Sequence, residues 1–332
     1  MSTRPAGPPT SPLSLDTALE EVAARASELD REPRFPQENF EALIASGLLR
    51  EAAGDPGDLV REVALVRAVA AADASTARIL DGHLNGVERL SRSAPAPLRE
   101  REMQAIRDGR LLLGVWGADP SPGEGPPARL LRSDGGLCLR GVKTFCSGAG
   151  GVQRTLVVAT DEQSRRRLAY VDAGEAIAID RGWYRVSGLR SSESHRVEFH
   201  DTPVLGLLGD PGELGAEPWF SRDAIRTTAT WVGLCDCILG SALRLIDPER
   251  ANEVQTHGIG RMLVAHATIE RWMTHAVSEL ADPESVERDC VDASQLAALC
   301  RIAVAEASRE ISGLAATICG SRALAGGGAL ER

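Results

Sequence analysis

A short segment in the middle of the chain combines an aromatic ring, a hydroxyl and several glycines. It reads KTFCSGAGG, from Lys143 to Gly151. In a β-strand, side chains two positions apart share a face, so Phe145 and Ser147 would point together and Cys146 to the opposite side. A flat apolar wall beside a hydroxyl suits a planar ring cofactor, and glycines let the backbone approach a ligand closely. The pattern also fits a strand that enters an ordinary glycine-rich turn, and on these residues alone that second interpretation is favoured.

Other residue patterns give weaker indications of a functional site. The seven cysteines fit no zinc-ligand spacing and are expected to be buried, reduced thiols. His257, His266 and His275 are nine positions apart, so neighbouring members face opposite sides of a helix and predict no metal site. His266 and Glu270, four positions apart, are typical of a pair on a helix surface. The sequence also shows no P-loop and no G-x-G-x-x-G after a strand.

Composition restricts the class of protein. The length of 332 residues predicts two or three packed units, and the 43% hydrophobic and 25% charged residues are ordinary for a globular protein. A formal net charge of −10 disfavours a nucleic-acid partner. No apolar run reaches the roughly 20 residues that span a bilayer, and the start MSTRPAGPPTSP lacks the apolar segment of a secretory signal. We therefore expect a cytoplasmic protein with neither a nucleic-acid nor a membrane partner.

Hydrophobic periodicity divides the chain into three parts. A proline-rich tail over residues 1–12 precedes helical spacing over 13–109. Residues 110–215 contain short β-rich runs separated by turn residues. Helical periodicity returns over 216–332 in stretches long enough for a bundle. The expected fold is α+β and multidomain: an N-terminal α-helical domain, a middle antiparallel β-barrel domain and a C-terminal helical bundle.

Four segments, in this order, resemble the acyl-CoA dehydrogenase family. Ala68–His83 is similar to a family helix that carries aspartate, serine and alanine before a histidine. Gly114–Gly125 resembles the strand and loop that run along the flavin, and Leu137–Gly151 is similar to the strand with N/R-G-x-K, an aromatic and Ser/Thr. Ser187–Val204 resembles the strand that closes the β-domain. The chain is on this basis identified as a member of the acyl-CoA dehydrogenase superfamily, truncated at the C-terminus relative to that family.

The resemblance implies a flavoprotein that holds FAD. Two positions would lie beside the substrate: Glu124, and Ser192 near the pantetheine arm of a thioester. Ala118 stands where the family usually has a threonine, which would remove one hydrogen bond to the flavin ring. Of the family's R-x-x-F-G motif, which reaches a neighbouring subunit's FAD, only Arg261 remains as a phosphate contact. The implied cofactor-binding residues are Trp116, Gly117, Ala118, Phe145, Ser147 and Arg261.

The base for thioester dehydrogenation is the weakest part of the resemblance. A carboxylate must remove the α-proton while hydride passes to the flavin. The family's common catalytic glutamate lies in a segment that this sequence lacks, and Asp223 aligns with the position that some members use instead. Asp223 also suits the start of a helix, where a carboxylate favours the helix dipole, and this structural role is preferred.

Three functions follow from these residues. The leading interpretation is α,β-dehydrogenation of an acyl-CoA or acyl-carrier-protein substrate, with an unidentified electron acceptor. The alternatives are a flavin-dependent monooxygenase of the same superfamily, which needs no α-proton base, and a non-catalytic paralogue that serves as a structural or binding subunit. A homodimer or homotetramer is expected, because the C-terminal helices carry broad apolar faces. These faces contain Leu263, Ile269, Trp272, Met273, Leu296, Leu299, Ile302, Ala303 and Ala307.

Overall fold

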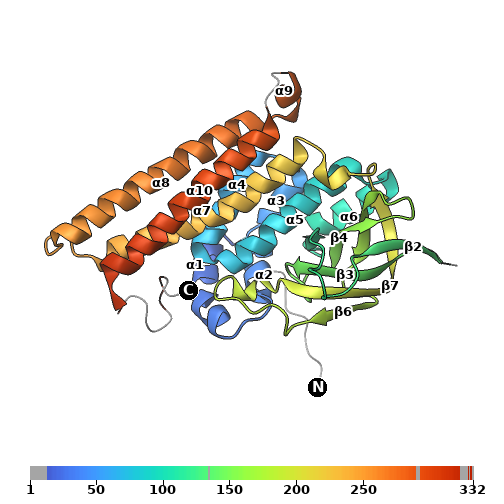
Figure 1. Ribbon diagram of the computed structural model, residues 1–332, viewed down its shortest axis with the longest axis horizontal. Helices are drawn as coiled ribbons and strands as arrows, with labels where there is room; N and C mark the ends of the chain where they lie inside the picture. Colours follow the sequence, from blue (N-terminus) through green and yellow to red (C-terminus); the bar gives the residue numbers. More distant parts are fainter. Residues whose placement is uncertain (1–12, 134, 289–291, 322–327, 329, 331–332) are drawn as a thin grey trace.

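The N-terminal part of the chain is helical, as its periodicity predicts. The computed structural model describes residues 13–133, 135–288, 292–321, 328 and 330 (Figure 1). Two of the helices begin at aspartates whose carboxylates accept backbone N–H groups: Asp58 accepts from Arg61, and Asp73 from Thr76. The helices are α1 (Leu15–Arg31), α2 (Gln37–Ala45), α3 (Leu48–Gly54), α4 (Leu59–Ala72), α5 (Ala74–Ser93) and α6 (Ala96–Arg107).

The middle part forms one sheet, whose strands follow α6. The described strands are β1 (Leu113–Trp116), β2 (Arg129–Ser133), β3 (Gly136–Cys146), β4 (Arg154–Thr160), β5 (Arg166–Asp172), β6 (Ile177–Asp180) and β7 (His195–Leu208). Strand β4 pairs with β2, β2 with β3, β3 with β7, β7 with β5, and β5 again with β4, so these five strands close into a ring. Strands β1 and β2 both run parallel to β4. The other pairings are antiparallel, so the sheet is mixed and the expected antiparallel domain is found only in part. Its description as a barrel stays a prediction.

Long helices return after the sheet. They are α7 (Trp219–Leu245), α8 (Glu253–Leu280), α9 (Pro283–Arg288) and α10 (Ala293–Cys319). Helices α7, α8 and α10 run side by side, and α7 also packs along α4 (Figure 1). None of the helices that the structure describes combines the length and the apolar composition of a bilayer-spanning segment.

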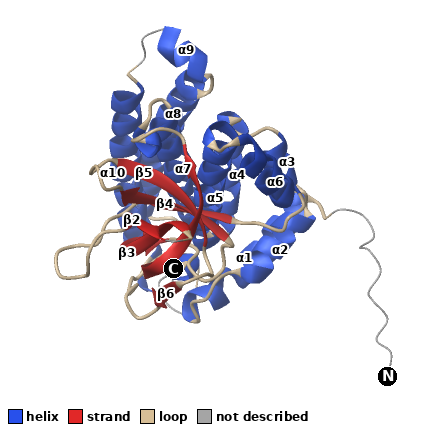
Figure 2. Ribbon diagram, turned by 90° about the vertical axis from the view of Figure 1, so that its right-hand side faces the viewer, coloured by secondary structure: helices blue, strands red, loops and turns tan. Residues whose placement is uncertain are grey.

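Helix α5 lies beside the strands (Figure 2). Helix α5 contacts β1, α7 and the short 3-10 turn η1 (Arg190–Ser192). One apolar core runs through all three parts, with Leu43 from the N-terminal helices, Val197 from the sheet and Ile269 from the C-terminal helices. The changes from helix to strand and back fall between α6 and β1 and between β7 and α7. Division into domains at 109/110 and 215/216 stays a prediction.

Candidate functional site

The end of β3 contains an irregularity that exposes an aromatic ring. Pairing between β3 and β7 shifts register between Lys143 and Cys146. Within this bulge Phe145 has a φ of 51°, which is uncommon for a residue with a side chain. Phe145 is 57% exposed, whereas Cys146 and Ser147 are buried. The bulge therefore replaces the simple alternation expected from the sequence, and it turns the Phe145 ring outward.

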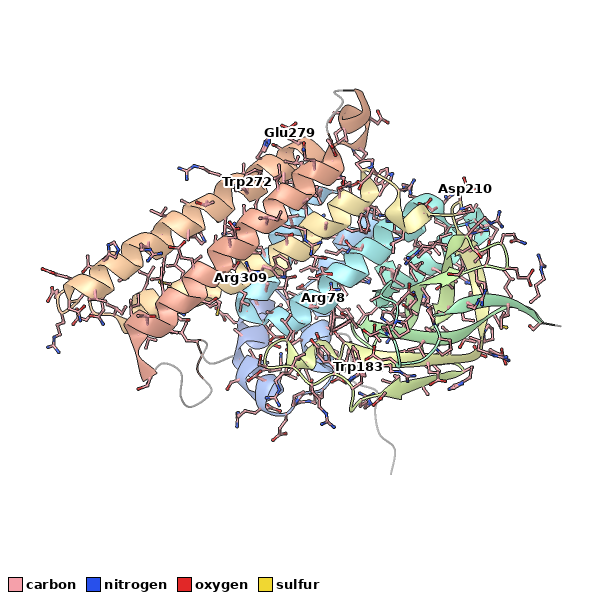
Figure 3. All side chains as sticks on the ribbon, in the orientation of Figure 1. Arg78, Trp183, Asp210, Trp272, Glu279 and Arg309 are labelled. Atoms are coloured by element: carbon pink, nitrogen blue, oxygen red, sulfur yellow. The ribbon has the colours of Figure 1, made fainter. Side chains whose placement is uncertain are left out.

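A second aromatic residue completes this feature. Trp183, in the loop between β6 and β7, meets Phe145 edge to face, with ring centroids 4.9 Å apart. Its indole N–H donates to Glu124 Oε1 at 2.7 Å, and Glu124 Oε2 accepts from the backbone of Ser121. These bonds, above all the one from Trp183, lower the pKa of Glu124. Glu124, expected beside the substrate, thus fixes the Trp183 ring. Figure 3 shows Trp183 close to the strands.

The end of β1 lies directly beside this aromatic pair. Trp116 is fully buried, and its indole N–H donates to the carbonyl of Ser147 at 3.0 Å. The carbonyl of Ala118 accepts from the backbone of Thr144 at 3.2 Å. The structure therefore brings Trp116, Gly117 and Ala118 together with Phe145 and Ser147, as the sequence predicts. The Trp116 ring supports the backbone from inside the core, so any cofactor contact by this residue stays a prediction.

Lys143 holds the β1–β2 loop in place. Its ammonium is completely buried, 2.5 Å from Asp119 Oδ1 and 3.1 Å from the carbonyl of Gly117. Burial lowers the pKa of Lys143, and the bond to Asp119 opposes that shift. The family pattern includes this lysine, but sequence reasoning gave it no role.

A chain of hydroxyl groups leads away from Ser147. Ser147 Oγ lies 2.9 Å from Ser194 Oγ, and Ser194 Oγ lies 2.8 Å from Ser192 Oγ. Ser192 then donates to the hydroxyl of Tyr184 at 3.3 Å. Ser192 is fully buried. Its predicted contact with a thioester arm stays untested, and the structure gives it a place in this chain.

A buried histidine lies between α5 and β1. His83 Nδ1 accepts from the backbone N–H of Leu113 at 3.1 Å, which leaves the ring proton on Nε2 in the neutral form. Nε2 has no partner among the described residues. Burial lowers the pKa of His83 to about 4, so the ring is neutral near pH 7. The family-like motif contains His83, but the sequence gave no indication of this buried environment.

Asp223 belongs to a buried ionic cluster. Its carboxylate lies 2.7 Å from Arg89 and 3.2 Å from Arg226, and the side chain is 12% exposed. Arg226 also pairs with Glu62 and Glu88 at 2.6 Å each. Burial raises the pKa of Asp223 to about 6, against the opposing effect of the two arginines. The structure thus replaces the solvated helix-start position preferred from the sequence with a buried ion pair, because Asp223 lies beyond the first turn of α7 and faces Arg89. A role as catalytic base stays a prediction.

Arg261 lies apart from these residues. It is on α8 and pairs with Glu310 of α10 at 2.6 Å. In this one chain it does not join the group around Phe145. Its contact with a neighbouring subunit's cofactor stays untested.

One group of possible metal ligands occurs among the described residues. The ligand atoms of Asp236, His266 and Glu270 lie within 4.8 Å of one another. Arg67 donates to Asp236 and Glu270, and His266 Nε2 lies 2.6 Å from Asp236 Oδ1. The Arg67 guanidinium already neutralises the carboxylates, so this is an ion-pair cluster. The predicted helix-surface pair of His266 and Glu270 is in fact partly buried against α4 and α7.

The sequence was compared with protein-family models and with known proteins. No family model matches the chain. Dibenzothiophene monooxygenases from Rhodococcus qingshengii and Rhodococcus erythropolis are 27% identical over 215 residues, 58% of this chain. The match spans 49% of the length of these curated relatives.

Solved structures match nearly the whole chain. KijD3 in complex with FMN and a dTDP-linked amino-keto sugar has a TM-score of 0.81 at 23% identity, covering 96% of this chain and 85% of that one. Methanesulfinate monooxygenase MsuC from Pseudomonas fluorescens has a TM-score of 0.80 at 21% identity, covering 97% and 90%. FMN-bound TdsC from Paenibacillus sp. A11-2 has a TM-score of 0.77 at 20% identity, covering 93% and 87%. The fold is acyl-CoA dehydrogenase-like.

These comparisons correct two expectations from the sequence. KijD3 and TdsC hold FMN, so the prediction of FAD is wrong. The relatives are monooxygenases of dibenzothiophene and methanesulfinate, and they do not support α,β-dehydrogenation of an acyl thioester. The family-like motifs indicate a fold that flavin-dependent dehydrogenases and monooxygenases share. They therefore could not distinguish dehydrogenation from oxygenation. The comparisons favour the monooxygenase alternative.

Proposed function

We propose that this protein is an FMN-dependent monooxygenase. The observation that carries the proposal is the exposed Phe145 ring, set edge to face against Trp183 beside Ser147. An outward-facing aromatic at a positive φ is costly unless it has a task, and such strain collects at ligand sites. The resemblance of the fold to FMN-bound structures supports FMN as the ligand.

The residues present fit a flavin ring. Phe145 and Trp183 offer an apolar wall, and the Ser147 hydroxyl offers a hydrogen-bonding group next to it. Reduced FMN would supply the two electrons with which one atom of O₂ enters the substrate and the other leaves as water. The aromatic pair would exclude water from one side of the ring. Glu124 and Lys143 would keep the two loops that carry the site in register.

This chemistry agrees with the state of the buried acids and bases. Oxygen insertion needs no base for an α-proton, so Asp223 can remain an ion-pair partner of Arg89 and Arg226. The neutral His83 carries an Nε2–H behind β1 that can donate a hydrogen bond, and it holds no proton to transfer near pH 7. The proposed substrates are small heteroatom compounds of the kind named for the relatives, with dibenzothiophene and methanesulfinate as the first to test.

The experiment combines flavin supply with isotope labelling. The purified protein receives FMN, chemically reduced before mixing, together with ¹⁸O₂ and each candidate substrate. Incorporation of one ¹⁸O atom into product, detected by mass spectrometry, is the expected result. Phe145→Ala should lose incorporation, whereas Arg132→Gln on β2 should retain it. A colourless protein that binds no flavin would refute the proposal and favour a non-catalytic paralogue.

We also propose that the protein assembles as a homodimer or homotetramer. Several apolar side chains on α8 and α10 are exposed in the single chain: Leu263, Val264, Leu299 and Ile302. Side chains of the same faces that point inward, such as Ile269 and Met273, are buried in the core. The apolar faces thus exceed what packing within one chain covers, which is typical of an oligomer interface.

A further inference from the structure

A cavity lies beside the segment that connects β7 to α7. Its volume is about 420 Å³, and its walls come from β4, the start of β5, the short 3-10 turn η2 (Glu213–Gly215) and the first turn of α7. Small-molecule sites in proteins have volumes of about 300–1,000 Å³, so the cavity can hold a ligand of that class. Neither Phe145 nor Ser147 lines it, so it does not form part of the proposed flavin-ring site.

Much of the cavity lining is apolar. Val158 of β4 and Leu168 of β5 are direct partners on neighbouring antiparallel strands, so their side chains share one face of the sheet. Both are buried, and Leu214 of η2 adds a third aliphatic side chain. Phe220, in the first turn of α7, lines the same cavity and is 50% exposed. An apolar ligand in the cavity would remove part of the Phe220 ring from water, which favours binding.

An arginine in the same lining lacks a counter-ion. Arg167 forms no ion pair with any residue that the structure describes, and its guanidinium makes one hydrogen bond within the described ranges. This bond runs from Nη2 to the carbonyl of Gly209, at 3.5 Å. The Nε atom is buried and has no hydrogen-bond partner among the described residues. Buried polar groups nearly always find a partner, so this guanidinium points to an acceptor supplied by a bound molecule.

The other charged side chains of the lining already have partners. Glu213 pairs with Arg92 through its Oε1 atom. Arg166 lies 3.9 Å from Asp119 Oδ2. Arg167 therefore carries the one positive charge of this lining that no described carboxylate matches. A ligand with a single negative charge would match it.

We propose that this cavity binds a small apolar carboxylate, meaning an apolar molecule that carries one carboxylate group. The apolar body lies against Val158, Leu168 and Phe220, and the carboxylate pairs with Arg167. Arginine offers a planar fork of donors that fits the two oxygens of a carboxylate. Burial of the apolar body supplies affinity, and the arginine selects the charge. The inference does not depend on the proposed function, because no flavin takes part in it.

The test compares two probes of similar shape by isothermal titration calorimetry: naphthoate, and the uncharged alcohol naphthylmethanol. The wild-type protein should bind naphthoate about tenfold or more tightly than the alcohol, which is the usual effect of a charged hydrogen bond. Arg167→Gln should weaken naphthoate binding by about the same factor. Its affinity for the alcohol should not change, and this also shows that the variant is folded.

The aromatic wall is tested separately. Phe220→Ala should weaken the binding of naphthoate and of naphthylmethanol alike, by about three- to tenfold, because it removes an aromatic contact that both probes make. The matched control is Arg132→Gln, which removes an exposed arginine from β2 and should leave both affinities unchanged. Acetate, which has the carboxylate without the apolar body, should not displace naphthoate at equal concentration.

Three results would overturn the assignment. The first is a folded wild-type protein that binds no naphthoate at millimolar concentration. The second is an Arg167→Gln variant that binds naphthoate as tightly as the wild-type protein, or that loses affinity for the acid and the alcohol equally. The third is a Phe220→Ala variant with unchanged affinity for both probes, which would place naphthoate elsewhere on the molecule.

Discussion

The ring of Phe145 meets the edge of Trp183 at a centroid separation of 4.9 Å and an interplanar angle of 78°. Glu124 joins the pair through a 2.7 Å bond to the indole N–H. The three residues come from the bulged end of β3, the loop before β7 and the loop after β1. The aromatic wall of the proposed site is therefore assembled from three segments, and the Glu124 carboxylate fixes its geometry.

Replacing Glu124 tests whether this arrangement serves flavin binding. Glu124→Ala removes the acceptor for the Trp183 N–H, so the indole should lose its fixed position and FMN should bind about three- to tenfold more weakly, as expected for an aromatic contact of about 0.5–1.5 kcal/mol. Glu124→Gln keeps a carbonyl oxygen for the same bond and should bind FMN like the wild-type protein. Fluorescence titration with FMN measures both. Equal affinities for the alanine and glutamine variants would mean that the pair has no part in flavin binding.

Replacing Asp223 separates a structural role from a catalytic one. In Asp223→Ala, Arg89 and Arg226 lose an acceptor, and Arg89 keeps only the carbonyls of Glu213 and Leu214 among the described residues. Loss of one partner from a buried pair should lower the free energy of unfolding by about 3 kcal/mol, measured by denaturant titration. Asp210→Asn, at an exposed aspartate (Figure 3), is the control and should change it little.

At a temperature where the Asp223→Ala variant is folded, its FMN binding and its oxygenation rate should equal those of the wild-type protein. A general base would behave differently, because its removal costs about 10²–10⁴-fold in rate. Such a loss in a folded variant that still binds FMN would restore Asp223 as a catalytic residue.

The order of elements and the residues at the end of β1 and β3 could be predicted from the sequence, and the shape of the site could not. Period-two and helical patterns are local, so they located the change from helices to strands and back. The outward turn of Phe145 depends on the β3–β7 register, which is set by residues far apart in the chain. The same holds for Trp183, whose position depends on a bond to Glu124.

The burial of charged side chains could not be predicted from the sequence either. Asp223 follows an arginine at the start of a helix, which is typical of an exposed helix start. Its burial follows from the packing of α7 against α5, which brings in Arg89. The sequence motifs could not separate FAD from the FMN that KijD3 and TdsC hold, since motifs along the ring describe the part that the two cofactors share.

The exposed apolar residues on α8 provide a test of assembly. Val264 is 69% exposed, the highest value among the large apolar side chains described as exposed, and Leu263 beside it is 48% exposed. A charge at Val264 would have to be desolvated on association, so Val264→Glu should shift a dimer or tetramer toward monomer in light scattering at micromolar concentration. Leu205→Glu, at an exposed apolar residue of β7, should keep the wild-type mass. A monomeric wild-type protein would contradict the proposed assembly.

The neutral state of His83 predicts a specific dependence of stability on pH. Burial lowers the pKa of His83 from its ordinary 6.5 to about 4. Between these values the unfolded chain binds a proton that the native chain does not, so the His83 contribution is complete above pH 6.5 and is lost as pH falls toward 4. The shift corresponds to about 3 kcal/mol. Asp223 acts in the opposite sense: its pKa is raised from 3.8 to about 6, so its native form gains stability as pH falls through 6.

The contributions of His83 and Asp223 have opposite signs, so they partly cancel in the pH dependence of the wild-type free energy of unfolding. Subtracting the free energy of unfolding of a His83 variant isolates the His83 contribution. His83→Asn keeps an oxygen that can accept from the Leu113 N–H and removes the titrating ring. The wild-type free energy of unfolding minus that of the variant should fall by about 3 kcal/mol from pH 7 to pH 4, because all other groups cancel. Urea titrations of both proteins at the two pH values give this difference. An unchanged difference would mean that the His83 ring takes up a proton as readily in the native chain as in the unfolded one.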